Sequence, residues 1–99
     1  MATYQILYWH DIPVQVRARY ERQRVNLPLP DRFQLAVDLA AMEANLTGSD
    51  TYTDLFLWSV EMERQGSAQD VAEAVVAELI SKFPTIEWRK TAESVKHGE

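Results

Sequence analysis

The sequence has no cysteine among its 99 residues. This absence excludes a disulfide framework, thiolate metal sites and a cysteine nucleophile. The chain also has no apolar run that approaches the roughly 20 residues of a membrane-spanning helix. Its first residues lack the basic stretch and apolar core of a signal peptide. We therefore expect a protein that acts in the cytoplasm and makes no contact with a membrane.

Glycine and histidine are also scarce, with three and two residues. The sequence contains no glycine-rich phosphate loop and no Gly-x-Ser-x-Gly motif. It also has no paired-carboxylate motif with a supporting sequence context. His10 and His97 lie near opposite ends of the chain, whereas metal sites usually need three or more ligands. We therefore expect no catalytic residue and no metal site, and an enzyme is the less favoured class.

What the chain does have is enough apolar material for a core. Hydrophobic residues make up 46% of it, and three are tryptophan. A chain of this length buries well over half of the surface that its unfolded form exposes, so it can fold alone as one domain. We expect a single α+β domain over residues 1–88, followed by a polar, frayed tail over residues 89–99.

Residues 4–20 predict a pair of strands. The first strand, residues 4–9, is largely apolar on both faces, as in the centre of a sheet. In the second, residues 14–20, apolar side chains alternate with polar and basic ones, which indicates a half-buried strand with a basic, solvent-facing side. Because the link is short and contains a proline, we expect an antiparallel hairpin with a bulge or wide turn at residues 10–13.

The rest of the chain predicts two main helices and one more strand. Pro28 and Pro30 exclude a helix from residues 21–30, which we expect to be a polar turn followed by an extended segment. Hydrophobic spacing, capping residues and period-2 alternation then predict a helix over residues 31–45, a short helix to about residue 56, a strand over residues 58–63, and a helix that begins after Ser67 and ends at Pro84.

The expected order of elements is thus β-β-α-(short α)-β-α. It favours an α+β fold in which a small antiparallel or mixed sheet of about three strands is covered by two main helices. In the third strand, Trp58, Val60 and Met62 should share the buried face, and the acidic residues between them should face solvent.

Charge is unevenly distributed along the chain, whose net charge is −5. Residues 12–32 carry five arginines and two acids, whereas residues 33–81 carry one arginine and nine acids. The acidic total argues against non-specific binding of nucleic acid. The uneven distribution indicates either two solvated faces or a basic surface that meets an anionic ligand or partner.

Such a basic surface would centre on Arg17 and Arg19. Residues two apart on a strand point to the same face, so the two guanidinium groups could together hold a phosphate or a polycarboxylate. Glu61 and Glu63 have the same spacing on the expected third strand. If the two strands are neighbours, the four charges would instead pair with one another. The sequence leaves both alternatives open.

His10 and Asp11 are an adjacent acid–base pair. Neighbouring residues on an extended segment point to opposite sides, so we do not expect them to act as a dyad. Asp11 precedes Ile-Pro, where its carboxylate can bond backbone N–H groups two residues on and set the turn. The three tryptophans are not interleaved with the arginines, and we expect them in the core and at its rim rather than stacked on bases.

Several segments resemble the bacterial "virulence factor" domain family, which is named after a conserved staphylococcal virulence protein. The likeness runs from about residue 4 to residue 82, and its most specific part is Tyr-Trp-x-Asp-Ile-Pro, followed here by the usual basic residue. It rests on Ile6-Leu-Tyr-Trp-His-Asp-Ile-Pro-Val-Gln-Val16, on Leu29-Pro-Asp-Arg-Phe33 with Ala36 and Ala41-Met42, and on Thr51-Tyr-x-x-x-Phe-x-Trp58. Genes of this family often lie beside those of tetrahydrofolate-linked one-carbon and corrinoid methyl-transfer enzymes, so the resemblance implies a partner in that chemistry. It implies no catalytic residues.

Three functions follow as hypotheses. The first is a non-enzymatic accessory module that docks on a partner protein, which the resemblance suggests is a folate-dependent one-carbon enzyme. The second is a small protein that binds or converts an anionic ligand, such as the glutamate tail of a tetrahydrofolate derivative, and no other cofactor is expected. The third is RNA binding through the basic strand, the least favoured because of the acidic total.

Each hypothesis needs a surface, and an exposed strand edge could also pair two copies of the chain. We expect the ligand or partner surface to consist of Asp11, Arg17, Arg19, Arg22 and Arg24.

Overall fold

The computed structural model describes residues 1–46 and 50–97. The α+β class is confirmed, but the described part of the chain has five strands rather than about three, and four helices rather than two main ones and a short one. The elements follow in the order β1 (Ala2–Trp9), β2 (Ile12–Tyr20), β3 (Gln23–Pro28), α1 (Asp31–Glu43), α2 (Asp50–Asp54), β4 (Phe56–Trp58), β5 (Met62–Arg64), α3 (Ala68–Lys82) and α4 (Trp88–Lys96).

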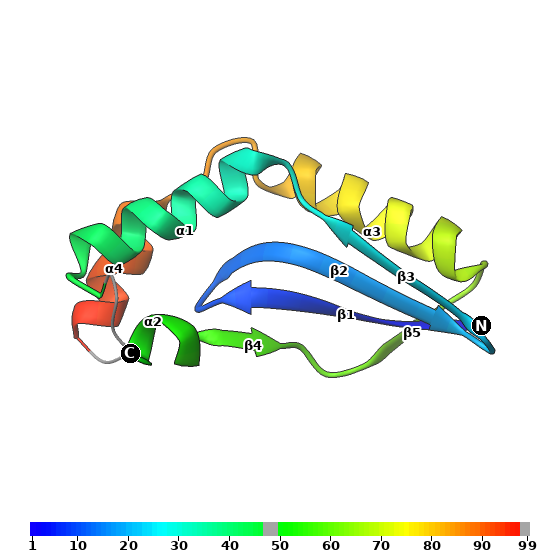
Figure 1. Ribbon diagram of the computed structural model, residues 1–99. Helices are drawn as coiled ribbons and strands as arrows, with labels where there is room; N and C mark the ends of the chain where they lie inside the picture. The colour runs from blue at the N-terminus through cyan, green and yellow to red at the C-terminus, as the bar shows by residue number, and fades with distance from the viewer. Residues whose placement is uncertain (47–49, 98–99) are drawn as a thin grey trace.

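The five strands form one antiparallel sheet, which confirms the antiparallel alternative (Figure 1). The order across the sheet is β3-β2-β1-β4, and β5 pairs with β1 along the same edge as β4. Strand β1 therefore has partners on both sides, as its apolar character predicts.

Helices α1 and α3 lie along one side of the sheet (Figure 1). Ile6 and Val16 face each other across β1 and β2, point toward these helices, and are 6% and 0% exposed. The apolar core is therefore enclosed between the helices and one face of the sheet. The residues between them in the strands point to the opposite face, where Arg17 and Arg19 are exposed.

Strands β1 and β2 form the predicted hairpin. Their register holds as far as Leu7 opposite Gln15 and then shifts by one residue, so that Val14 is the extra residue of a β-bulge next to Pro13. In the turn, His10 adopts a left-handed conformation with a φ of 57°. The expected irregularity between the strands is confirmed, and the bulge lies at its end.

Strand β3 corrects the expectation over residues 21–30, where a polar turn and an extended segment were predicted but no strand of the sheet. Only residues 21 and 22 form the turn, and β3 then pairs with β2 at the edge of the sheet. Val25 and Leu27 are half-buried and carry the alternation of a strand. Pro28 is the last residue of β3, where its missing N–H interrupts no interior ladder, so the proline is compatible with an edge strand.

The single strand expected over residues 58–63 is wrong, because it is split into β4 and β5. Ser59 donates its backbone N–H to the oxygen of Ile6 at 2.8 Å, and the Ser59 hydroxyl accepts the N–H of Ile6 at 2.9 Å. Between β4 and β5, the side chain of Ser59 thus takes the place of a backbone carbonyl as the partner of the Ile6 N–H. Val60 then turns outward and is 79% exposed, so the expected buried face fails there.

Three of the four helices correspond to predicted ones. Pro30 lies at the N-cap of α1, directly before the helix begins at Asp31. The hydroxyl of Ser67 accepts the backbone N–H of Asp70 at 3.1 Å, which confirms the predicted cap of α3. The stop signal expected at residues 47–49 lies outside the described residues. None of the described helices is long and apolar enough to cross a membrane.

The structure differs from the expected frayed tail, because residues 88–96 form helix α4. Helix α4 packs against α1 (Figure 1), and Thr91 and Ala92 are 2% and 0% exposed. With Trp88 and Val95, these residues follow the i, i+3, i+4, i+7 spacing of a helix, which the polar composition of the segment concealed.

Candidate functional site

Three arginines lie side by side on the face of the sheet that points away from α1 and α3. Arg17 and Arg19 alternate with buried residues on β2, and Arg24 of β3 is directly opposite Arg19. Gln5 of β1 is opposite Arg17 on the other side. We call this surface the arginine face, and it comprises Thr3, Gln5, Arg17, Arg19, Arg24 and Asn26.

A cavity of about 320 Å³ opens in the arginine face, and we call it the arginine cavity. Its lining comes from β1, β2, β3 and the stretch between β4 and β5. The volume is within the range of small-ligand sites. The lining residues are Thr3, Tyr4, Gln5, Arg17, Ala18, Arg19, Arg24, Asn26 and Glu61.

Arg17 is held in place by two contacts. Its Nε donates to Oε1 of Gln5 at 2.9 Å, and its guanidinium carbon lies 3.8 Å from the centre of the Trp58 ring. Gln5 is itself anchored, because its Nε2 donates to the backbone oxygen of Ser59 at 2.9 Å. Cation–π stacking and a hydrogen bond to Nε fix the plane of the guanidinium group and leave its terminal nitrogens pointing elsewhere.

Arg19 forms an ion pair with Glu61, so one of the two alternatives that the sequence left open applies to this arginine. Its Nη2 lies 3.1 Å from Oε1 of Glu61, and the two side chains are 53% and 51% exposed. An ion pair this exposed stabilises the fold by at most about 1 kcal/mol. The carboxylate of Glu61 is therefore held in the arginine cavity only weakly.

The considered pairing of all four charges does not form among the described residues, because Arg17 contacts neither Glu61 nor Glu63. Strand β5 neighbours β1 and not β2, so Glu63 lies opposite Thr3 and a whole strand separates it from Arg17. Sequence spacing alone could not show which strands are adjacent.

Arg24 lies beside Arg19 with no carboxylate of its own. Within the described residues, its side chain has no hydrogen bond or ion pair. Like charges directly opposite each other on neighbouring strands repel. The three arginines of the cavity thus share a single carboxylate, that of Glu61, and the arginine cavity carries an excess of positive charge.

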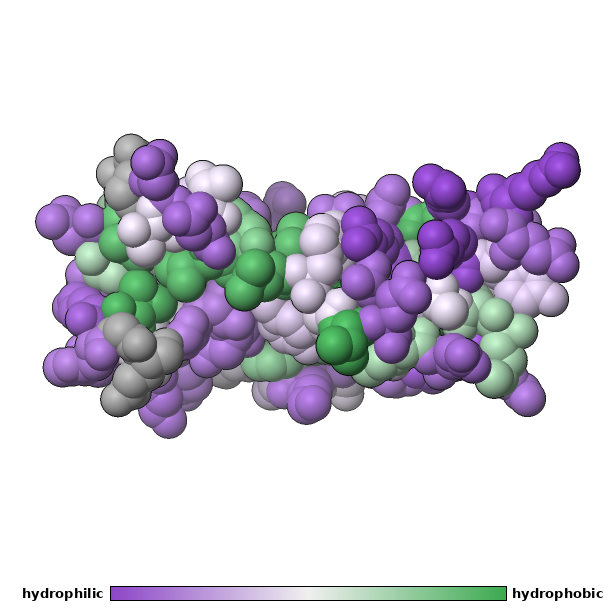
Figure 2. All heavy atoms as spheres, turned by 90° about the horizontal axis from the view of Figure 1, so that it is seen from below, coloured by the Kyte–Doolittle hydropathy of each residue, from purple (hydrophilic) through white to green (hydrophobic). Residues whose placement is uncertain are grey.

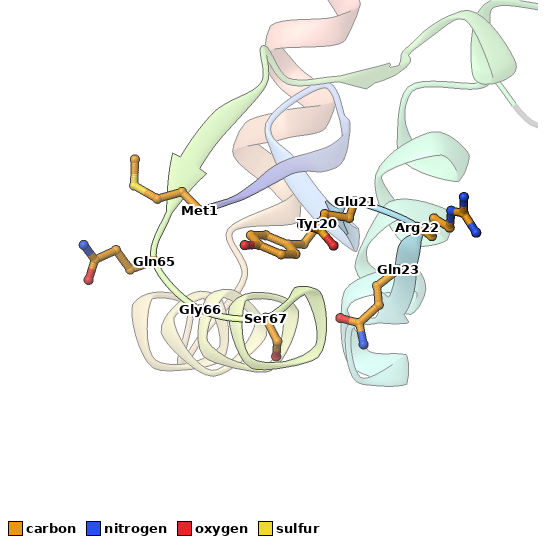
Figure 3. A pocket seen from close by; sticks show the side chains of 8 residues that line it. All are labelled: Met1, Tyr20, Glu21, Arg22, Gln23, Gln65, Gly66 and Ser67. Atoms are coloured by element: carbon orange, nitrogen blue, oxygen red, sulfur yellow. The ribbon is translucent and has the colours of Figure 1, made fainter.

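The structure separates Arg22 from this group. Arg22 lies in the turn between β2 and β3, which borders an open hollow lined also by Met1, Tyr20 and the start of α3. In Figure 3, the ring of Tyr20 lies across this hollow and the side chain of Arg22 points away from it. Arg22 is absent from the lining of the arginine cavity.

Asp11 is also apart from the arginines. It lies in the turn between β1 and β2, and its Oδ1 accepts a hydrogen bond from the hydroxyl of Thr91 at 2.5 Å. This contact joins the hairpin to α4. The turn position of Asp11 was expected, whereas its partner was not, because α4 was not predicted.

The groups that most often perform acid–base or metal chemistry do not gather at the arginine cavity. Among the residues that the structure describes, there is no set of three or more His, Asp or Glu residues that could hold a metal ion.

Two tyrosines outside the arginine cavity have raised pKa values. Burial raises the pKa of Tyr8, and the nearby Tyr4 raises it further. Burial and then the charge of Asp38 raise the pKa of Tyr52.

The face seen from below, on the side where β4 lies in Figure 1, is largely hydrophilic (Figure 2). Hydrophobic side chains interrupt it toward the left and the middle. Strand β4 and the stretch that follows it contribute Leu57 and Val60, which are 67% and 79% exposed. The apolar side chains on this side of the molecule gather from the left toward the middle and are bordered by polar ones (Figure 2).

Sequence reasoning missed Thr3, Gln5 and Asn26 of the arginine face, and it missed Trp58 as a contact of Arg17. Asn26 lies opposite Arg17 on β3, and Gln5 lies opposite it on β1. The signal that could have found them is the cross-strand register, which required β3 to be recognised as a strand. Trp58, expected as packing, is half-buried and stacks on Arg17.

Comparison with known proteins identifies the family. The family model described as "Virulence factor" matches residues 7–92, which is most of the chain. The chain therefore belongs to the virulence factor family, and the resemblance seen in the sequence is confirmed. No curated protein and no solved structure matches it.

Proposed function

We propose that this member of the virulence factor family is a non-enzymatic protein-interaction module that binds an acidic segment of a partner protein on its arginine face. The observation that carries the proposal is the placement of Arg17, Arg19 and Arg24 around one cavity with a single carboxylate between them. Because a surface with excess positive charge attracts anionic groups, an acidic segment is the complementary partner.

The arginine face also has the rigidity that a docking surface needs. It is built on three adjacent strands rather than on a loop, and the helices behind it bury the other side of the sheet. A surface that is already in its binding conformation loses little conformational entropy on association. The supporting feature is therefore a preorganised row of guanidinium groups.

The family resemblance suggests the class of partner. A tetrahydrofolate-linked one-carbon enzyme is our first candidate, acting with this domain in the cytoplasm. In this proposal the domain is an accessory protein to methyl transfer. A second copy of the chain is an alternative partner, since β3 is an edge strand of the sheet.

A second candidate function is the binding of a small anionic ligand, and the cavity itself favours it. A volume of about 320 Å³ suits a small molecule whose carboxylates bind arginine in a bidentate manner. The glutamate tail of a tetrahydrofolate derivative has this chemistry. RNA binding is less favoured, because Trp58, the aromatic residue beside the arginines, is half-buried and one of its faces is covered by Arg17.

The test is a comparison of two charge reversals. Arg24→Glu places a negative charge in the arginine cavity, whereas Arg22→Glu makes the same change in net charge at the neighbouring turn, outside the cavity. We expect tagged wild-type domain to capture a stoichiometric partner from native lysate. Arg22→Glu should retain that partner, and Arg24→Glu should lower its affinity about tenfold or more.

Three results would count against this function. They are the absence of any stoichiometric partner, equal capture by both variants, and loss of capture by Arg22→Glu alone. Calorimetry with tetrahydrofolate derivatives separates the second candidate, because heat of binding that Arg24→Glu abolishes would identify a small ligand. A gel shift with RNA that is strong at low salt and lost steeply as salt rises would favour nucleic acid instead.

A further inference from the structure

We infer that the arginine cavity is a carboxylate subsite that Glu61 occupies in the unbound protein, so that a glutamate or aspartate side chain of the partner competes with Glu61 for Arg19. This inference rests on the proposed function. It adds that a carboxylate is the group recognised on the partner, and that Glu61 of the chain itself competes with that carboxylate. It is carried by the contacts inside the cavity rather than by its charge alone.

The first step is that the cavity already accepts a carboxylate. Oε1 of Glu61 lies 3.1 Å from Nη2 of Arg19, and Glu61 reaches this position from the stretch between β4 and β5, with β1 between that stretch and Arg19. The position of Glu61 thus shows that a carboxylate group fits in the arginine cavity. An incoming side chain of the same chemistry can take the same hydrogen-bond donors.

The second step is that donors remain for a ligand. Nε of Arg17 is used by Gln5, but within the described residues the two terminal nitrogens of Arg17 make no hydrogen bond or ion pair. Arg24 is likewise without a partner there. A guanidinium group offers five N–H donors in a fixed plane and binds a carboxylate through two of them. One internal carboxylate therefore leaves most of the donors in the cavity unused.

The third step is that the orientation of Arg17 is set before a ligand arrives. Stacking at 3.8 Å on Trp58 and the hydrogen bond to Gln5 hold the guanidinium group. A planar donor held in this way loses less freedom when it binds than a mobile lysine would. Arg17 is therefore the anchor of the subsite, and Arg19 is the residue that changes partner.

The fourth step is that breaking the ion pair between Arg19 and Glu61 costs little free energy. The ion pair is about half exposed on both sides, and such pairs contribute little to the stability of a fold. A partner carboxylate that also engages Arg17 and Arg24 gains more contacts than the Glu61 contact loses. Glu61 thus lowers the affinity for weak anions while permitting a multivalent acidic segment to bind.

The experiment measures binding of a synthetic oligo-glutamate peptide to the full chain by calorimetry at fixed ionic strength, with an oligo-glutamine peptide as the uncharged comparison. The variants are Glu61→Gln and Glu63→Gln, which change the net charge equally. Glu63 is an exposed residue opposite Thr3 on β5 and does not line the cavity. Both substitutions are at exposed positions, so both variants should fold.

We expect Glu61→Gln to bind the oligo-glutamate peptide up to about fivefold more tightly than the wild type. Glu63→Gln should show a clearly smaller gain, from general electrostatics alone. Equal gains in the two variants, or no gain in Glu61→Gln, would overturn the inference. In either case, if the peptide binds the wild type and Arg24→Glu abolishes that binding, the proposed interaction function is retained. Only the competition by Glu61 is then rejected. If the peptide binds no variant, both ideas fail.

Discussion

Arg17 illustrates how much of a side chain's role depends on its neighbours. Its position on the solvent-facing side of a strand was readable from alternation with buried residues. Its partners were not, because Gln5 and Trp58 belong to two other strands whose register the sequence does not reveal. The result is a guanidinium group held by an amide and an indole rather than by a carboxylate.

Arg19 and Glu61 show the opposite case. Their pairing was predicted as one alternative and is confirmed by a contact of 3.1 Å. Pairing could be considered because Glu61 and Glu63 have the same spacing as Arg17 and Arg19. The sequence could not show which charges would meet, because Glu61 lies between β4 and β5 and reaches Arg19 past β1.

Tyr8 supports a prediction about alkaline pH. Burial raises its pKa above the ordinary value of 10.0, with a further contribution from Tyr4. Above pH 10 the unfolded chain therefore releases this proton more readily than the folded one, so the free energy of unfolding should fall as pH rises. Urea unfolding between about pH 9 and pH 11 should show this decline.

In the same experiment Tyr8→Phe should flatten the decline, and Tyr4→Phe should flatten it less, since Tyr4 is the smaller cause. If the pH dependence of Tyr8→Phe matched that of the wild type, burial of Tyr8 would not be its source.

At the scale of elements, the best-predicted parts are those whose sequence signal is local. The hairpin, α1 and α3 each have strong periodicity and recognisable ends, including the Ser67 cap. Strand β3 was missed because the two prolines indicated only an extended, non-helical segment, although an edge strand tolerates proline at its end. Helix α4 was missed because only two of its residues are buried, and its apolar stripe is narrow.

Helix α4 gives a test of packing at this scale. Ala92 is fully buried on the side of α4 that faces the body of the protein, so Ala92→Leu should overpack the contact and lower the free energy of unfolding by about 1–3 kcal/mol. Ala77→Leu makes the same change at an exposed position of α3 and should stay within about 0.5 kcal/mol of the wild type. Urea unfolding measures both.

A frayed segment would tolerate leucine at position 92. Indistinguishable stabilities for the two variants would therefore show that α4 does not pack against the body in solution.

At the scale of the molecule, the fold divides its sheet into two faces with different tasks. The face under α1 and α3 supplies the core, and the arginine face is left to solvent. The sequence predicted this division through the alternation of β2. It could not predict the cavity, which requires residues of three strands and of the stretch before β5 to come together.

The same scale explains why two predicted site residues, Asp11 and Arg22, do not join the arginine cavity. Both lie in turns, at positions outside the regular alternation of β2. Strand residues of the right parity share a face, but turn residues leave the sheet in a direction set by local geometry. Asp11 contacts α4 instead, and Arg22 borders the hollow near Tyr20.

The most direct test of the account is to locate where an acidic peptide binds. Nuclear magnetic resonance of the nitrogen-15-labelled chain, titrated with the oligo-glutamate peptide, reports each backbone amide and the side-chain Nε–H of arginine. The account predicts that the largest shifts occur at the Nε–H of Arg17, at the indole N–H of Trp58 and at amides of β2 and β3. Shifts confined to the helices or to the hollow around Tyr20, or no shifts at all, would contradict it.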